Sequence, residues 1–172
     1  MFLSEPTTTL TDYAMAILSA VQAVALRRAI IAADRPPDMA ARLYLAGFTM
    51  AAWASFAGGS SHGFRAQLGS YWGPVWTFTV WAIITAFVLL IAAGIRSSAR
   101  PVATDPMARR RGRRWLLAGF GTTAVGLTLL VQKVSFHQHF NHNDLYHVVQ
   151  LGGLYGVYRG GRTLLGLDQD QV

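Results

Sequence analysis

The sequence contains no cysteine, and this absence removes two classes of site at once. Without thiols, the chain can form neither disulfide bonds nor metal sites with thiolate ligands. Charged residues are also scarce: they make up 13% of the 172 residues, whereas a soluble domain usually carries about 25%. Long apolar runs accompany this deficit, and together they indicate an integral membrane protein.

Acidic residues are the rarer of the two charge types, with eight Asp and Glu against fifteen Lys and Arg. The resulting net charge of +7 is compatible with nucleic-acid binding, but the arginines fall in the connections between apolar runs. Positive connections are typical of membrane proteins, where they determine the orientation. We therefore expect membrane lipids around the chain and no nucleic-acid partner. The first ten residues lack the basic region of a signal peptide, so the first apolar run is predicted to be a retained helix.

Five apolar segments predict five transmembrane helices in one all-α domain that covers residues 1–172. The predicted spans are roughly residues 10–33, 37–60, 71–95, 115–134 and 143–165. About 20 residues per helix are enough to cross a hydrocarbon core roughly 30 Å thick. Thr11 is expected to cap the first helix and Asp12 to lie in its first turn, where the helix dipole favours an anion.

The distribution of basic residues predicts the orientation of these helices. Thirteen of the fifteen Lys and Arg belong to one side of the membrane, and only Arg65 and Lys133 belong to the other. The positive side is normally cytoplasmic. The N-terminus is then outside and the C-terminus inside, in a bacterial inner membrane. All five histidines fall on the outer, periplasmic side, although only Lys and Arg were used to predict the orientation.

Histidines and other polar residues cluster between residues 136 and 150. This stretch contains His137, His139, His142 and His147, and the fifth histidine, His62, follows a Gly-Gly-Ser-Ser run. If the last helix begins near Asn143, one of its faces carries Asn143, Asp144, His147 and Gln150. Lipid cannot satisfy such a stripe, so it must be buried against protein or water. Ionisable residues at membrane depth are functional candidates.

A zinc site is the first chemistry that these residues suggest. Imidazole and carboxylate are the usual zinc ligands when cysteine is absent. The predicted ligands are His62 and His147, with His142 or Asp144 as the third, which leaves one position for water. Asp144 or Asp12 would move protons. Each of these residues also has a structural interpretation: a buried, hydrogen-bonded histidine, or an acid in the first turn of a helix.

Two motifs resemble those of a known superfamily. The stretch from Asn143 to Tyr155 resembles the last-helix motif of the alkaline ceramidase-like group in the CREST superfamily of membrane hydrolases. The Gly-Gly-Ser-Ser-His-Gly-Phe stretch around His62 resembles the superfamily motif in which Ser precedes His by four residues. The resemblance implies zinc bound by three histidines, and hydrolysis of lipid amides or esters. His62 and His147 match directly.

The sequence departs from this superfamily at several positions. Members usually have seven spans. Asn143 stands in place of the first histidine of the final pair, and Gly58 stands in place of the serine. The resemblance makes Ser60 or Ser61 the substitute for this serine, although their position at a helix end favours capping over nucleophilic catalysis.

These observations lead to two functional hypotheses of different classes. The first is a zinc-dependent membrane hydrolase that acts on a lipid amide or ester at the periplasmic side. The alternative is a non-enzymatic accessory subunit of a membrane complex, whose histidines bind a pigment, haem or structural metal. Other membrane subunits or a second copy of the chain are open as partners.

Overall fold

The computed structural model describes residues 3–34, 36–99, 105–137 and 140–168. In this part of the chain the regular structure is helical, apart from one isolated bridge between His137 and Phe140. The five long helices are α1 (Pro6–Ala32), α2 (Met39–Gly63), α4 (Trp72–Ala99), α5 (Pro106–Val131) and α6 (His142–Leu164). Two short helical segments, α3 (Arg65–Leu68) and η1 (Gly69–Tyr71), connect α2 to α4. The all-α prediction is confirmed.

Three of the helical segments in the described residues are long and apolar enough to cross a membrane. They are α1, the segment Arg65–Ala99 that includes α4, and α5. The other two long helices do not meet this criterion. α2 packs mainly against α4 and α1, and α6 packs mainly against α5 and also against α1 and α4. The structure therefore supports a membrane protein with at least three helices of spanning length.

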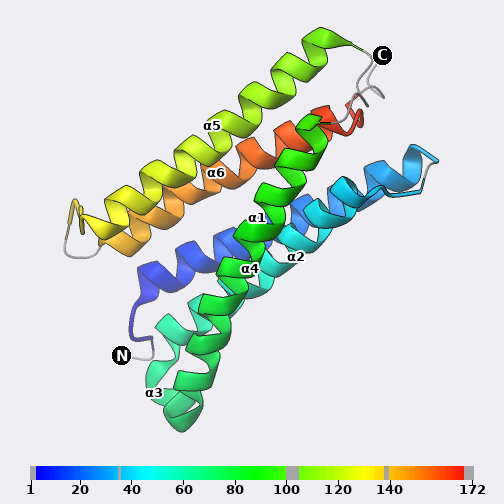
Figure 1. Cartoon of the computed structure of the whole chain (residues 1–172). Helices are drawn as coiled ribbons and strands as arrows, with labels where there is room; N and C mark the ends of the chain where they lie inside the picture. Colours follow the sequence, from blue (N-terminus) through cyan, green and yellow to red (C-terminus); the bar gives the residue numbers. More distant parts are fainter. Residues whose placement is uncertain (1–2, 35, 100–104, 138–139, 169–172) are drawn as a thin grey trace.

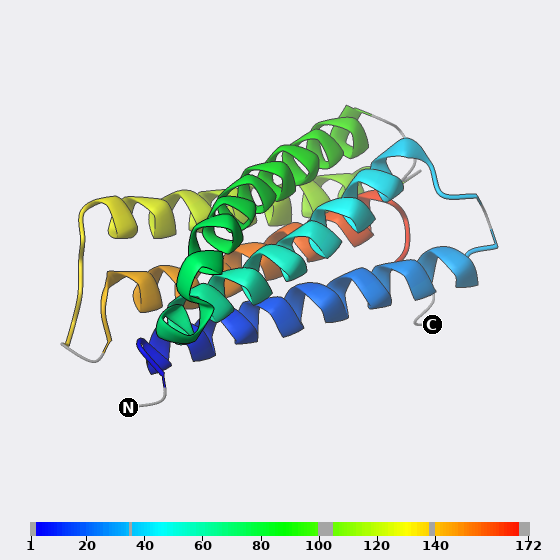
Figure 2. The same cartoon turned by 90° about the horizontal axis from the view of Figure 1, so that it is seen from below.

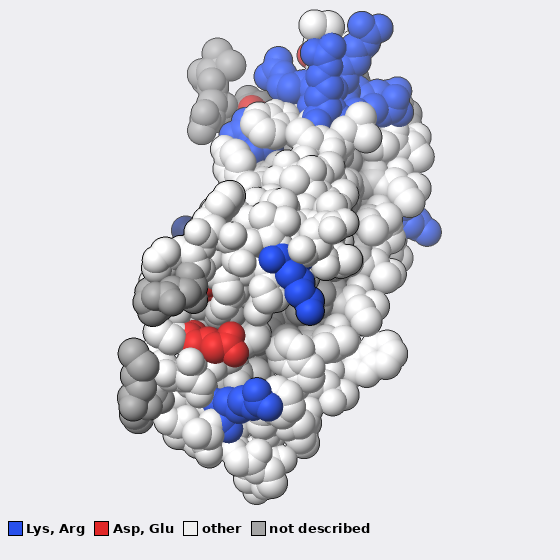
Figure 3. Space-filling view, turned by 90° about the vertical axis from the view of Figure 1, so that its left-hand side faces the viewer, with Lys and Arg blue, Asp and Glu red and all other residues white. Residues whose placement is uncertain are grey.

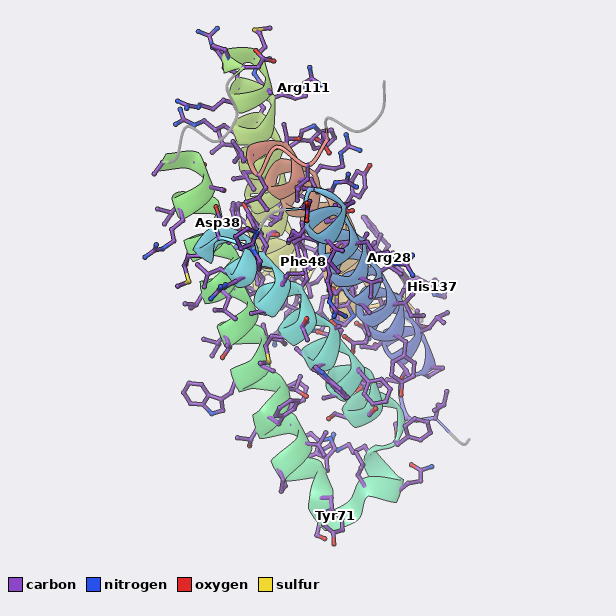
Figure 4. The ribbon with its side chains drawn as sticks, turned by 90° about the vertical axis from the view of Figure 1, so that its right-hand side faces the viewer. Arg28, Asp38, Phe48, Tyr71, Arg111 and His137 are labelled. Carbon is purple, nitrogen blue, oxygen red and sulfur yellow. The ribbon has the colours of Figure 1, made fainter. Side chains whose placement is uncertain are left out.

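The chain runs back and forth along the long axis of the molecule (Figures 1 and 2). At one end α1 and α6 begin and α2 stops; we call this the histidine end, because α2 stops just after His62 and α6 starts at His142. At the other end α1 and α4 stop and α5 begins, and Lys and Arg side chains gather there (Figure 3). We call this the arginine end. Tyr71 and Arg111 lie at opposite ends of the molecule (Figure 4).

Two helices begin earlier than the sequence predicts. α1 starts at Pro6 instead of residue 10, and α5 starts at Pro106 instead of residue 115. Proline is favoured in the first turn of a helix, because the backbone N–H groups there have no hydrogen-bond partner within the helix and the N–H that proline lacks is not needed. In α5 the Asp105 side chain also caps the helix by accepting from the backbone N–H groups of Met107 and Ala108. The arginines that follow therefore lie on a helix and not in a loop.

Glycines allow α5 and α6 to pack with their backbones in contact. A Cβ atom at Gly119 would lie 2.5 Å from the backbone nitrogen of Val157, and one at Gly156 would lie 2.7 Å from the Cα of Gly119. Small residues at regular spacing are the usual way in which membrane helices approach closely. This contact holds α6, and with it His147, in a defined position.

Candidate functional site

A buried carboxylate and a buried imidazole meet at the histidine end. The Nε2 atom of His147 on α6 lies 3.4 Å from Oδ1 of Asp12 on α1. Only 4% of Asp12 and 7% of His147 is exposed. The second oxygen of Asp12, Oδ2, is buried and has no hydrogen-bond partner in the part of the chain that the structure describes. A buried charge of this kind is costly unless it is paired, which is why such groups are rare outside functional sites.

The early start of α1 places these residues. Because the helix begins at Pro6, Thr11 and Asp12 lie inside it, and the cap predicted at Thr11 is not observed. The Thr11 hydroxyl lies 3.0 Å from Nδ1 of His147. Both ring nitrogens of His147 therefore contact polar groups of the same helix, and α1 determines the orientation of the imidazole.

The hydrogen atoms of this group can be assigned to a small set of arrangements. Thr11 has one hydroxyl proton and three nearby acceptors: the carbonyl oxygens of Thr7 and Thr8, at 3.2 Å and 3.0 Å, and Nδ1 of His147 at 3.0 Å. If the proton goes to a carbonyl, Nδ1 carries the ring hydrogen; if it goes to Nδ1, Nε2 carries it. In the first arrangement Nε2 has no hydrogen, so the contact is favourable only if Asp12 is protonated and donates to Nε2. In the second, Nε2 donates its hydrogen to the ionised Asp12. The 3.4 Å contact thus allows Asp12 and His147 to share a proton, and we call them the proton-sharing pair.

Glycines of α2 make room for Asp12. A Cβ atom at Gly58 would lie 3.4 Å from both carboxylate oxygens of Asp12, and one at Gly59 would lie 2.8 Å from the ring of Tyr13. The Gly-Gly-Ser-Ser-His run thus has a structural role at these two positions. It lets α1 approach α2 closely enough for Asp12 to be enclosed.

A second histidine–carboxylate pair lies beside the first and is more exposed. Nδ1 of His62 lies 3.1 Å from Oε2 of Glu5, the residue that precedes α1. The His62 ring packs edge-on against Trp76 of α4, with the ring centres 5.5 Å apart. The histidines of α2 and α6 are therefore both paired with acids from the start of α1.

An apolar cavity of about 170 Å³ opens beside these pairs. Its polar lining comes from Asp12, His62 and His147 together with Asn143, Tyr146 and Gln150. The rest is mostly aliphatic and aromatic, and includes Met15, Ala51, Ile83, Phe87, Leu90, Leu130 and Leu154. A cavity with one polar region and a long apolar wall suits an amphipathic molecule.

The structure brings some of the predicted site residues together and separates others. His62, His147 and Asp12 line the same cavity, whereas His142, Asp144 and Ser61 do not. Asp144 forms a capping box with Asn141: its Oδ2 accepts from the Asn141 backbone N–H at 2.8 Å, and the Asn141 side chain accepts from residues of the first turn. His142 is the first residue of α6 and is half-buried.

The remaining predicted residues have other surroundings. Ser61 is buried, and its hydroxyl has no hydrogen-bond partner among the described residues. Ser60 bonds to Tyr13 and to the Phe56 carbonyl, as expected of a serine at a helix end. His137 lies in the bridge to Phe140, and His139 lies outside the described residues.

The described residues contain no group of three or more His, Asp or Glu side chains arranged to hold a metal ion. The four predicted zinc ligands, His62, His142, Asp144 and His147, are all among these residues. Two of them, His62 and His147, line the cavity, but they are engaged with carboxylates of α1.

Thr11 and Glu5 were not identified as site residues from the sequence. The signal that could have revealed them is Pro6, because proline at the first helical position predicts that α1 begins there. Glu5 then precedes the helix, and Thr11 lies inside it next to Asp12. Which residue of α6 faces them depends on helix packing, and the sequence alone does not contain that information.

The sequence was also compared with known proteins. It matches a protein family described as a family of unknown function (DUF6962), over residues 7–107 and 106–165. No curated protein and no solved structure matches the chain significantly.

Proposed function

We propose that this chain, which belongs to the DUF6962 family of unknown function, is a membrane-embedded hydrolase that cleaves an amide or ester bond in an amphipathic lipid. One observation carries the proposal. Asp12 is buried at an apolar cavity, with one oxygen beside His147 and the other without a partner among the described residues. A buried acid–imidazole pair that borders a largely apolar cavity is suited to acid–base chemistry on an amphipathic molecule.

The proposal includes the placement of the chain in a bacterial inner membrane. All five long helices would cross the bilayer, with the histidine end on the periplasmic side and the arginine end on the cytoplasmic side. The gathering of Lys and Arg at one end supports this orientation (Figure 3). The cavity then lies toward the periplasmic leaflet, within reach of the head groups and upper acyl chains of its lipids.

The lining of the cavity supports the substrate class. Its apolar wall, formed by residues such as Phe87, Leu90 and Leu130, would hold an acyl chain. The polar residues at the histidine end would then lie beside the amide or ester group that joins the chain to its head group. Asn143, Tyr146 and Gln150 could donate hydrogen bonds to the carbonyl oxygen, where negative charge develops during hydrolysis.

The chemistry follows from the proton-sharing pair. Asp12 takes a proton from a water molecule, and the water oxygen forms a bond to the lipid carbonyl carbon. The bond from this carbon to the leaving nitrogen or oxygen then breaks, and the pair returns the proton to the leaving group. His147 holds Asp12 in position and shares the proton, so Asp12 is the proposed catalytic residue and His147 its partner.

Zinc is the cofactor that the superfamily resemblance implies. The donor atoms of His62, His147 and Asp12 are of the kinds that zinc prefers, and Asp12 Oδ2 is a buried oxygen that such an ion could use. As they stand, these described side chains are not grouped to hold a metal ion. The proposed reaction therefore uses only groups of the protein itself. Elemental analysis of the purified protein would show whether it also binds zinc.

The test is lipid turnover by the purified protein in nanodiscs. A panel of N-acyl amides and acyl esters with a labelled acyl chain is supplied, and release of the labelled fatty acid is measured. Asp12→Asn keeps the size of the side chain but removes its basicity. We expect it to lower the release rate by about 10²-fold or more, the usual contribution of a general base.

Asp34→Asn is the matched control, because Asp34 is an exposed acid at the arginine end and carries the same chemical change. It should leave the rate unchanged. Thermal unfolding of both variants shows that they are folded. Equal rates for wild type and Asp12→Asn would disprove the proposal. Absence of turnover together with a co-purified chromophore that absorbs in the Soret region would favour the accessory-subunit alternative instead.

A further inference from the structure

A groove between α4 and α5 is larger than the cavity at the histidine end, and Phe87 lines both. The groove has a volume of about 880 Å³, and it is lined mainly by apolar side chains of both helices, including Phe87, Ile91, Leu117, Phe120 and Leu127. α4 and α5 follow each other in the chain but hardly touch, because α4 packs on α2 and α5 packs on α6. The groove therefore separates the two halves of the bundle on one face.

The arginine end of the groove has a polar boundary. Arg113 of α5 lines the groove there together with Ser98 of α4. The Nη2 atom of Arg113 donates to the Ser98 carbonyl oxygen at 2.8 Å, which connects the two helices at this point. Arg113 is exposed, and a guanidinium has further N–H groups available for an anion.

The surroundings of Arg113 favour negative charge. Other arginines of the first turns of α5, such as Arg110 and Arg114, are exposed near it, and Lys and Arg side chains dominate this end in Figure 3. The acid closest in sequence, Asp105, is occupied in capping α5. Arginine binds phosphate with short, charge-assisted hydrogen bonds.

The length of the groove indicates what occupies it. At 1.5 Å per helical residue, it extends over about 18 Å of α4, from Phe87 to Ala99, and over about 21 Å of α5, from Arg113 to Leu127. The groove is therefore shorter than a hydrocarbon core about 30 Å thick, and somewhat longer than one leaflet of about 15 Å. An acyl chain whose head group lies beside Arg113 fits a groove of this length.

We propose that the α4–α5 groove binds an anionic phospholipid of the leaflet at the arginine end. An acyl chain lies along the apolar wall, and the phosphate contacts Arg113. Basic pockets between membrane helices on this side are a known way of holding anionic head groups. The inference needs the chain to lie in a membrane, but it does not depend on hydrolysis or on Asp12.

The experiment uses the full chain in nanodiscs that contain phosphatidylglycerol as a minor component in phosphatidylcholine. Native mass spectrometry after gentle release counts the phosphatidylglycerol molecules that stay bound. We expect one per wild-type chain. Arg113→Gln should lower the bound fraction about tenfold or more, because a hydrogen bond to a charged group is lost. Ala124→Trp, at an exposed position in the groove wall, should displace the acyl chain without changing the charge.

Arg111→Gln is the control, because Arg111 is also exposed on α5 but does not line the groove. Equal losses for Arg113→Gln and Arg111→Gln would mean that only the general surface charge attracts lipid, and would overturn the proposal. Retention of the lipid by Ala124→Trp would place it elsewhere and would also overturn it. A lipid-free dimer of wild-type chains would assign the groove to a second copy.

Discussion

Glycines bring helices together in two regions of this molecule, and the atoms that they contact differ. Between α5 and α6, a Cβ atom at Gly119 would meet backbone atoms of α6 at 2.5 Å and 2.8 Å. Between α1 and α2, a Cβ atom at Gly59 would meet the side chains of Tyr13 and Asp12 at 2.8–3.0 Å. The first contact holds two helices rigidly together. The second makes space for the side chains of Tyr13 and Asp12. These side chains can shift when a larger residue replaces Gly59, and Asp12 would then move away from its place beside His147.

The largest effect is expected from Gly119→Val. The new side chain meets the backbone of α6, which cannot move aside without separating the helices. We expect a loss of about 3 kcal/mol in the free energy of unfolding, at the upper end for overpacking, and low yield of folded protein. Thermal unfolding in detergent measures this. The control is Gly121→Val, since a Cβ atom at Gly121 has open space around it; similar losses in both variants would argue against a rigid α5–α6 contact.

A smaller loss of stability, with a larger effect on function, is expected from Gly59→Ala. Here the added methyl group displaces side chains of Tyr13 and Asp12, so the loss should be about 1 kcal/mol. Displacement of Asp12 from His147 should lower lipid hydrolysis by about tenfold. Gly73→Ala, in open surroundings near the start of α4, provides the comparison. Unchanged turnover in Gly59→Ala would show that the α1–α2 contact does not position Asp12.

The smallest effect is expected from Asp144→Asn. The amide oxygen can still accept from the Asn141 N–H, so the capping box is largely kept and the loss should be about 0.5 kcal/mol. Because Asp144 does not line the cavity, fatty-acid release should be unchanged. A strong loss of turnover in a folded Asp144→Asn variant would instead support the catalytic role that the sequence predicts for this residue.

The fold was largely predictable, because long apolar segments of the sequence are typical of helices that lie in a membrane. The five long helices agree with five apolar segments, and the histidines of α2 and α6 lie at one end as the distribution of arginines suggests. The main errors concern helix starts: proline was not used as the signal that opens α1 and α5. The orientation in a membrane and the number of spanning helices beyond three stay predictions.

The site was predictable only in part, because pairing across helices depends on rotation about each helix axis. His62 and His147 were identified, since helical spacing and topology bring them to one end. Asp12 was treated mainly as an acid at a helix start, whereas it is buried against His147. Asp144 was proposed as a ligand, although Asn141 and Asp144 have the spacing of a capping box and bond in that way.

The two helices that carry the proton-sharing pair, α1 and α6, are made at different times during biosynthesis. In the chain, 136 residues separate Thr11 from His147, so α1 is made and inserted long before its partner helix exists. During that interval Asp12 would stand at membrane depth without the imidazole that later faces it. Helix α2 follows directly, and its glycines Gly58 and Gly59 offer a niche for Asp12 and Tyr13. The α1–α2 contact can thus enclose Asp12 before α6 is made, whereas the contact between Asp12 and His147 requires α6 to be in place.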